Sequence, residues 1–202
     1  MIYEPAEDSF LMLRILKEKI PFLIKKNSNL KFLEIGAGSG IHLETAKNSG
    51  IKLENIFSSD IDKKAVLHCK KLGFNCIHSD LFEKIPKIKI RRDPNSEDRL
   101  IKKNRGFLYD LIIFNPPYLP EDSREPENSK TATTGGKKGN EIIIKFLKQA
   151  KNFLSKSGKI FLITSSLAKD VDFKKLKYNA KEIGCEKLFF EKLFIWELTK
   201  NL

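Results

Sequence analysis

The segment from Asn115 to Tyr118 has the residue types of a binding slot for a planar nitrogen group. It reads Asn-Pro-Pro-Tyr and directly follows a run of strand-forming apolar residues that begins at Leu111. The Asn115 side-chain oxygen and the Pro116 carbonyl can accept both N–H bonds of an amide or aryl amine, whose delocalised lone pair makes its nitrogen a poor nucleophile. The prolines add no backbone donor, and Tyr118 adds a flat aromatic face. The segment predicts a rigid slot, with a stiff turn that ends a strand as the alternative.

A glycine-rich loop, LEIGAGSG, begins next to the acidic side chain of Glu34. Glycines occupy every second position from Gly36, between a predicted strand and a predicted helix. Such a loop lets a ligand approach the backbone closely and offers helix N–H groups to an anion. A carboxylate at Glu34 would repel a pyrophosphate and suits a ligand with an ammonium group. A tight turn between strand and helix is the alternative interpretation.

Two further acids, Asp60 and Asp80, each end an apolar run. Asp60 can accept hydrogen bonds from both hydroxyls of a ribose. Asp80 can accept one from an exocyclic amine, and Leu81 beside it offers an apolar contact. Each acid alone is typical of a strand-end cap. Together with Glu34 they describe a ligand with an amino acid group, a ribose and an adenine, and S-adenosylmethionine has all three.

Strands and helices alternate along the elements that must position these residues. Apolar periodicity predicts strands at 31–35, 55–60, 75–80, 109–115 and 159–165, helices at 8–20, 41–47, 62–72, 140–154 and 171–182, and a terminal hairpin within 186–198. Asp8 or Ser9 is the expected cap of the first helix. This alternation predicts an α/β fold with a mostly parallel sheet covered on both faces. Ligands of such sheets bind beyond the carboxyl ends of the strands, where the predicted site residues lie.

The composition predicts one domain over residues 1–202. The chain is 41% hydrophobic and 32% charged, which is typical of a soluble globular protein. No apolar stretch is long enough for a membrane span, and the N-terminus lacks the features of a secretory signal, so we expect a cytoplasmic protein without membrane contact. The cysteines and histidines do not cluster at ligand spacing, so no metal site is predicted.

A net charge of +12 suits anionic partners such as RNA or the ribosome, and a solvated surface explains it equally well. A basic insertion at 84–105 breaks the regular rhythm of elements, and a solvated or disordered loop is favoured there over a binding arm. The polar segment 120–139 directly follows the slot and is a candidate substrate lid.

Three segments together resemble one branch of the class I methyltransferases. FNPPY at 114–118 is similar to the signature of enzymes that methylate an amide or exocyclic amine nitrogen. YEPAEDSF at 3–10 and GGKKGNE at 135–141 are similar to segments of the eukaryotic and archaeal HemK-like protein-glutamine N5-methyltransferases. The resemblance implies a Rossmann-like fold: a seven-stranded, mostly parallel sheet with a C-terminal antiparallel hairpin and helices on both faces.

The same resemblance implies the reaction, S-adenosylmethionine-dependent methylation of the glutamine N5 in the GGQ motif of a class I translation release factor. Asn115, Pro116 and Tyr118 would be catalytic, and Pro117 would complete the substrate slot. An N-terminal segment, 1–28, would cover that slot through Glu4, Pro5 and Glu7, and simple helix capping by these residues is an equally good interpretation. The implied cofactor-binding residues are Ser9, Glu34, Gly36, Asp60, Asp80, Leu81 and Asn115.

The resemblance also implies a small zinc-binding activator subunit that covers an apolar sheet edge near residues 74–80. FNPPY is shared with adenine-N6 methyltransferases, so methylation of RNA or DNA is the alternative activity. A chain of 202 residues leaves no room for the recognition domain that a base-flipping enzyme usually brings, which favours a protein or a single-stranded target. A non-catalytic binder that keeps the fold is a third interpretation, disfavoured because every expected site residue is present.

Overall fold

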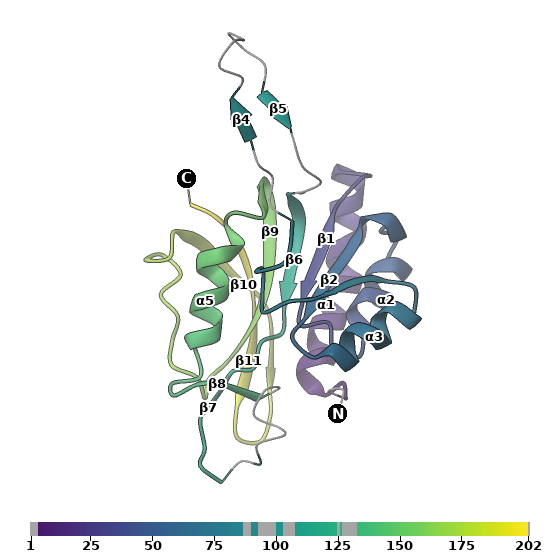
Figure 1. Ribbon diagram of the computed structural model, residues 1–202. Helices are drawn as coiled ribbons and strands as arrows, with labels where there is room; N and C mark the ends of the chain where they lie inside the picture. The colour runs from purple at the N-terminus through teal and green to yellow at the C-terminus, as the bar shows by residue number, and fades with distance from the viewer. Residues whose placement is uncertain are drawn as a thin grey trace.

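One sheet with helices on both faces forms the body of the molecule (Figure 1). The computed structural model describes residues 4–86, 90–92, 100–102, 108–124, 126 and 133–201. Within them the sheet has seven strands in the order β10-β11-β9-β6-β1-β2-β3. The strands are β1 (Phe32–Ile35), β2 (Ile56–Asp60), β3 (Asn75–His78), β6 (Tyr109–Phe114), β9 (Leu154–Ser165), β10 (Tyr178–Lys187) and β11 (Lys192–Lys200).

Five neighbouring strands of the sheet, β9, β6, β1, β2 and β3, run parallel to one another, whereas β11 is antiparallel to both of its neighbours. This arrangement confirms the predicted mostly parallel sheet and the terminal hairpin. The chain crosses from β3, at one edge, to β6 on the other side of β1. The carboxyl ends of β1 and β6 therefore flank a topological switch point, the usual ligand site of an open α/β sheet.

Each face of the sheet has its own apolar core because side chains alternate along the buried strands. Leu111 and Ile113 of β6 pack with α1 (Glu7–Lys26), α2 (Ile41–Asn48) and α3 (Lys63–Lys71). Ile112 and Phe114 point the other way and pack with α5 (Glu141–Ala150). The prediction of helices on both faces is confirmed, and the strand ends that carry the site are held from both sides.

The prediction of a helix at 171–182 is wrong. The chain makes turns up to Lys177 and then forms β10, which pairs only with β11 at the sheet edge. Tyr178 is buried in β10, while the four residues after it are exposed. An edge strand with so little burial lacks the period-two apolar pattern, and its lysines and glutamates resemble those of a surface helix.

Several predicted boundaries also move. Helix α1 begins at Glu7 after Ala6, without a side-chain cap, so Asp8 and Ser9 lie inside its first turn and do not cap it. It continues through Pro21 to Lys26, beyond the predicted end.

Two small sheets lie outside the main one. β4 (Ile90–Arg92) and β5 (Leu100–Lys102) pair antiparallel within the predicted basic insertion, and β7 (Leu119–Pro120) pairs in parallel with β8 (Thr134–Gly136). The rest of the insertion and of the predicted lid lies largely outside the described residues. Among the helices that are described, none is long and apolar enough to cross a membrane.

Candidate active site

A cavity of about 780 Å³ opens at the carboxyl ends of β1, β2, β3 and β6. This is the switch-point position that the strand order predicts. Among the residues that line it are all of the predicted site residues: Ser9, Glu34, Gly36, Asp60, Asp80, Leu81, Asn115, Pro116, Pro117 and Tyr118. By contrast, Glu4, Pro5 and Glu7 do not line the cavity, and the N-terminal segment reaches it through Asp8 and Ser9.

The glycine loop is held against the end of β2 by backbone hydrogen bonds. Both the Gly36 and the Ala37 N–H groups donate to the Ser59 carbonyl. Gly38 has φ 51°, a left-handed conformation that favours glycine, and a Cβ atom there would project into open space. Its N–H donates to Asp60 Oδ2 at 2.8 Å. The loop therefore keeps its backbone bare at the cavity wall, as close approach of a ligand requires.

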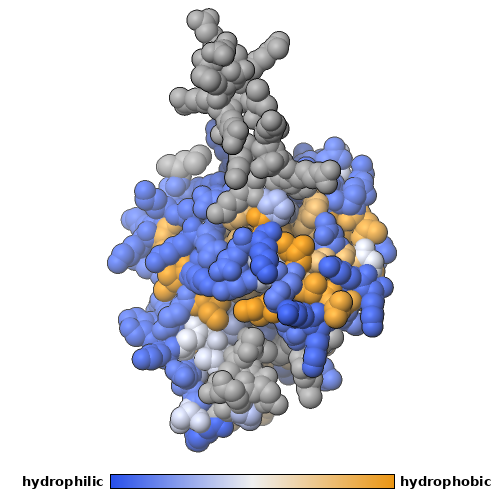
Figure 2. Space-filling view, viewed as in Figure 1, coloured by the Kyte–Doolittle hydropathy of each residue, from blue (hydrophilic) through white to orange (hydrophobic). Residues whose placement is uncertain are grey.

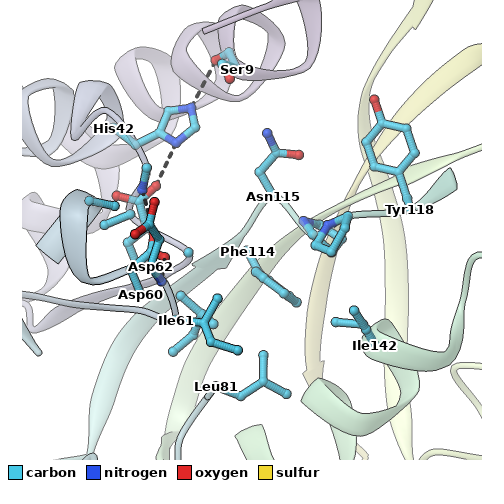
Figure 3. A pocket seen from close by; sticks show the side chains of 18 of the residues that line it. Ser9, His42, Asp60, Ile61, Asp62, Leu81, Phe114, Asn115, Tyr118 and Ile142 are labelled. Atoms are coloured by element: carbon cyan, nitrogen blue, oxygen red, sulfur yellow. Dashed lines mark hydrogen bonds and ion pairs between the residues drawn. The ribbon is translucent and has the colours of Figure 1, made fainter. Parts of the chain in front are cut away.

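Glu34 forms a buried pair with His42 (Figure 3). Oε1 of Glu34 lies 2.8 Å from His42 Nδ1, and the other ring nitrogen, Nε2, lies 3.0 Å from the Ser9 carbonyl. Burial raises the pKa of Glu34, although the charge of His42 opposes this. Burial alone would lower the pKa of His42, but the charge and hydrogen bond of Glu34 raise it above the usual value. The second carboxylate oxygen, Oε2, is buried without a hydrogen-bond partner in the described part of the chain.

Asp60 is the residue predicted to bind ribose hydroxyls. Its Oδ2 accepts from the Gly38 N–H and its Oδ1 from the Asp62 N–H, both at 2.8 Å. Burial raises the pKa of this carboxyl, while those backbone donors act in the opposite direction. Each carboxylate oxygen has a second lone pair, so each can accept one further hydrogen bond from a ligand in the cavity.

The turn after β3 places Asp80 and Leu81 at the cavity wall. Asp80 Oδ2 forms an ion pair with Lys145 Nζ of α5 at 2.5 Å, which leaves Oδ1 for a ligand amine. Leu81 has φ 47°, a left-handed conformation that is strained for a branched side chain. The Ser59 hydroxyl donates to the Leu81 carbonyl at 3.1 Å. Strained residues that the surrounding structure holds in place cluster at binding and active sites.

The Asn-Pro-Pro-Tyr segment forms the opposite wall of the cavity. Figure 3 shows Asn115 and Tyr118 across the cavity from His42 and Ser9. The Asn115 Oδ1 atom is buried and has no hydrogen-bond partner among the described residues. Such an acceptor is costly to bury unless a ligand supplies the donor.

The segment is braced from behind by the loop that contains β8. A Cβ atom on Gly135 would lie 2.6 Å from the Pro117 carbonyl oxygen, and one on Gly139 would lie 2.4 Å from that of Tyr118. Only glycine permits this contact between backbones. The Glu121 N–H donates to the Gly136 carbonyl at 3.0 Å and ties the exit of the slot to the same loop.

Sequence reasoning missed two of the cavity's charged pairings. His42 does not have the sequence spacing of a metal ligand, and the sequence assigns it no role. The signal that could have revealed its pairing is its distance from Glu34, which lies only eight positions earlier on the other side of the glycine loop. Lys145 lies on a helix far along the chain, and no sequence signal connects it with Asp80. No cluster of three or more potential metal ligands was found among the described residues.

The two unpartnered oxygens provide a test of whether S-adenosylmethionine fits the site. Glu34 Oε2 can accept from the ammonium group at the methionyl end, and Asn115 Oδ1 can accept an N–H bond at the opposite wall. Asp60 and Asp80 lie at the ends of neighbouring strands, with acceptor capacity for a ribose and an adenine amine. The residues present fit the cofactor.

Comparison with known proteins identifies the family. Residues 54–183, more than half of the chain, match the family model described as "Eco57I restriction-modification methylase". A Methanocaldococcus jannaschii protein, assigned by name to the protein N5-glutamine methyltransferases, is 32% identical, and the match covers 98% of this chain and 92% of the relative. The Schizosaccharomyces pombe eRF1 methyltransferase catalytic subunit is also 32% identical, over 80% of this chain and 71% of its own.

A solved structure supports the same fold. A chain of the E. cuniculi Mtq2-Trm112 complex matches with a TM-score of 0.62 at 21% identity over 98% of both chains, and that complex is described as responsible for the methylation of the translation termination factor eRF1. Two solved methyltransferases with this fold, at 14% and 15% identity, are in complex with S-adenosylhomocysteine and with AdoMet. The fold, the lining of the cavity and the relatives agree, and the chain belongs to the HemK-like protein-glutamine N5-methyltransferases.

Proposed function

We propose that this enzyme methylates the side-chain N5 of the glutamine in the GGQ motif of a class I translation release factor. The observation that carries the proposal is the buried, unpartnered Asn115 Oδ1 on a wall built from two prolines and a tyrosine. A primary amide has two N–H donors on a planar nitrogen, and this wall offers acceptors and a flat face without a competing backbone donor.

The slot activates the amide by positioning it. Asn115 Oδ1 accepts one N–H bond, and the Pro116 carbonyl accepts the other. With both donors held, the nitrogen lone pair is directed toward the cofactor side of the cavity, and Tyr118 stacks on the amide plane. When bound, S-adenosylmethionine supplies an electrophilic methyl group on a charged sulfonium. Catalysis then comes chiefly from alignment of two reactants, and the spare proton leaves after the attack.

Binding of the cofactor is assigned to the opposite wall and the strand ends. Glu34 Oε2 accepts from the ammonium group, Asp60 from the ribose hydroxyls and Asp80 from the adenine amine, with Leu81 against the ring. Gly36 and Ser9 shape the methionyl end of the cavity. These assignments are supported by the position of each residue on the cavity wall and by its free acceptor capacity.

The choice of a release factor as substrate is supported by the relatives. One relative at 32% identity is an eRF1 methyltransferase catalytic subunit. The Mtq2-Trm112 complex, whose chain has the same fold, is described as responsible for the methylation of eRF1. A release factor acts in translation, so the reaction would take place in the cytoplasm. A net charge of +12 suits a substrate that binds the ribosome, and contact with RNA is part of the proposal to be tested.

Mass spectrometry of the cognate release factor after incubation with the enzyme and S-adenosylmethionine tests the proposal. We expect a gain of one methyl group on the GGQ glutamine. Asn115→Ala should abolish this methylation. Transfer of labelled methyl groups to total RNA, with none on the release factor, would instead assign the chain to the adenine-N6 enzymes.

We also propose that a small zinc-binding activator subunit covers the β3 edge. β3 is the last strand of the sheet on this side, so its outer backbone groups are available for pairing. Leu67 and Leu72 of the neighbouring α3 segment are 59% and 40% exposed. Figure 2 shows apolar side chains on the side of the molecule that carries α3 in Figure 1. An apolar rim beside an open strand edge favours a partner that adds a strand.

Co-expression tests this pairing. With the activator, we expect a stable heterodimer and higher activity, and Leu67→Asp should weaken the heterodimer. The idea would be abandoned if the enzyme purified alone is monomeric and fully active and gains nothing from the activator.

A further inference from the structure

His42 is the only buried histidine among the described residues, and the reaction proposed above gives it no role. It is 4% exposed, lies in the first turn of α2 and is one of the residues that line the cavity. Its ring joins three elements: Nδ1 contacts Glu34 of β1, and Nε2 contacts the Ser9 carbonyl of α1. Because both ring nitrogens of His42 have hydrogen-bond partners, the positions of the protons on the ring are defined.

The partners of the ring decide that arrangement. The Ser9 carbonyl can only accept, so Nε2 carries a proton and donates it. A second proton must lie between Nδ1 and Glu34 Oε1, since a bare nitrogen and a bare carboxylate oxygen 2.8 Å apart would repel each other. The pair therefore has no net charge as a unit, and Oε1 is committed to His42.

This commitment fixes the direction of the other oxygen. With Oε1 held by His42, Oε2 is the atom of Glu34 that has no partner, and Glu34 lines the cavity. Without His42, Glu34 would be a buried carboxylate with no counter-charge, and burial would favour its neutral form. A neutral acid that is free to rotate is a poor partner for an ammonium group.

We propose that His42 is a positioning residue for the amino-acid end of the cofactor. It locks Glu34 with Oε2 turned into the cavity, keeps the carboxylate ionised when an ammonium group binds, and ties the start of α1 to the same site through the Ser9 carbonyl. The proposal rests on the assignment of Glu34 to the methionyl ammonium group. It extends that assignment by placing the control of Glu34 in His42, its hydrogen-bonded neighbour on the cavity wall.

Two ligands that differ only at the methionyl end separate positioning from general structure. S-adenosylhomocysteine has the amino acid group, whereas 5′-methylthioadenosine keeps the adenine, ribose and sulfur without it. Calorimetry should show that His42→Leu lowers affinity for S-adenosylhomocysteine about 10- to 100-fold, the range expected for hydrogen bonds to charged groups, while affinity for 5′-methylthioadenosine is retained. Retained binding of the second ligand also reports that the variant is folded.

Four further variants sharpen the test. Glu34→Gln should show the same selectivity between the two ligands. The double variant should be no weaker than Glu34→Gln alone, because the two residues act as one unit. His42→Gln keeps a donor for Glu34 and should recover part of the lost affinity, and His68→Gln on α3, outside the cavity, should change neither affinity.

Two outcomes for His42→Leu would overturn the proposal: equal loss of affinity for both ligands, which indicates a structural role, or unchanged affinity for S-adenosylhomocysteine. An unselective Glu34→Gln would also overturn it, because His42 acts through Glu34. Neither ligand requires the protein substrate, so these results do not depend on whether glutamine is the methylated group.

Discussion

Replacing Gly135 by alanine should inactivate the enzyme and leave cofactor binding intact. The new Cβ atom would lie 2.4 Å from the Gly139 carbonyl oxygen and 2.6 Å from that of Pro117, whereas ordinary contact begins at 3.4 Å. The obstructing atoms belong to the backbone, so no side chain can rotate away. The slot or its supporting loop must therefore move by about 1 Å, and a misplacement of this size costs about 100-fold in rate when catalysis depends on alignment.

The assay compares kcat for methylation of a GGQ-bearing release-factor domain with the dissociation constant of S-adenosylhomocysteine. Gly135→Ala should lower kcat and leave the dissociation constant close to that of the wild type. Gly184→Ala is a matched control, since its Cβ atom would meet Ile15 Cδ1 at 2.9 Å, the end of a flexible side chain far from the slot. Wild-type kcat in a folded Gly135→Ala variant would refute the idea that the β8 loop sets the position of the slot.

Two further predictions concern the adenine end of the cavity and the core. Asp80→Asn removes the charge that we propose accepts from the adenine amine, so affinities for S-adenosylhomocysteine and 5′-methylthioadenosine should fall together in calorimetry, by about 10-fold. Loss of only one of the two affinities would contradict this assignment. Burial raises the pKa of Tyr109 to about 12. The folded state favours the neutral phenol. The contribution of Tyr109 to the stability of the folded protein is therefore fully present below the pKa of the unfolded state, near 10, and is lost as pH rises through the folded-state pKa of about 12. In urea unfolding, the free energy of unfolding of Tyr109→Phe should fall by up to about 3 kcal/mol less than that of the wild type as pH rises over this range. An equal fall in both proteins would exclude Tyr109 as its source.

The site could largely be predicted because its parts are local in the chain. Glu34, Asp60 and Asn115 each end a strand or directly follow one, so the order of elements alone brings them to one edge of the sheet. The glycine loop could be predicted from its composition, because its alternate glycines take the left-handed conformations that a tight turn requires.

Contacts between distant segments could not be predicted in this way. The Asp80–Lys145 ion pair and the bracing of Pro117 by Gly135 depend on how α5 and the β8 loop settle on the sheet. His42 reaches Glu34 because the glycine loop folds α2 back onto β1, and a single sequence does not reveal that turn's direction. β10 was misread for a related reason, since its pairing with β11, and not its own pattern, makes it a strand.

The short β7–β8 pair has a consequence for how this enzyme can evolve. Leu119 pairs with Thr134 and Pro120 with Gly136, so the two ends of the segment between them are clamped side by side next to the slot. Lengthening a loop whose ends are already joined costs little, about 0.6 kcal/mol for each doubling. Insertions and deletions between Pro120 and Thr134 can therefore accumulate without moving Tyr118. This is a place where related enzymes can acquire different substrate preferences while the chemistry of methyl transfer stays the same.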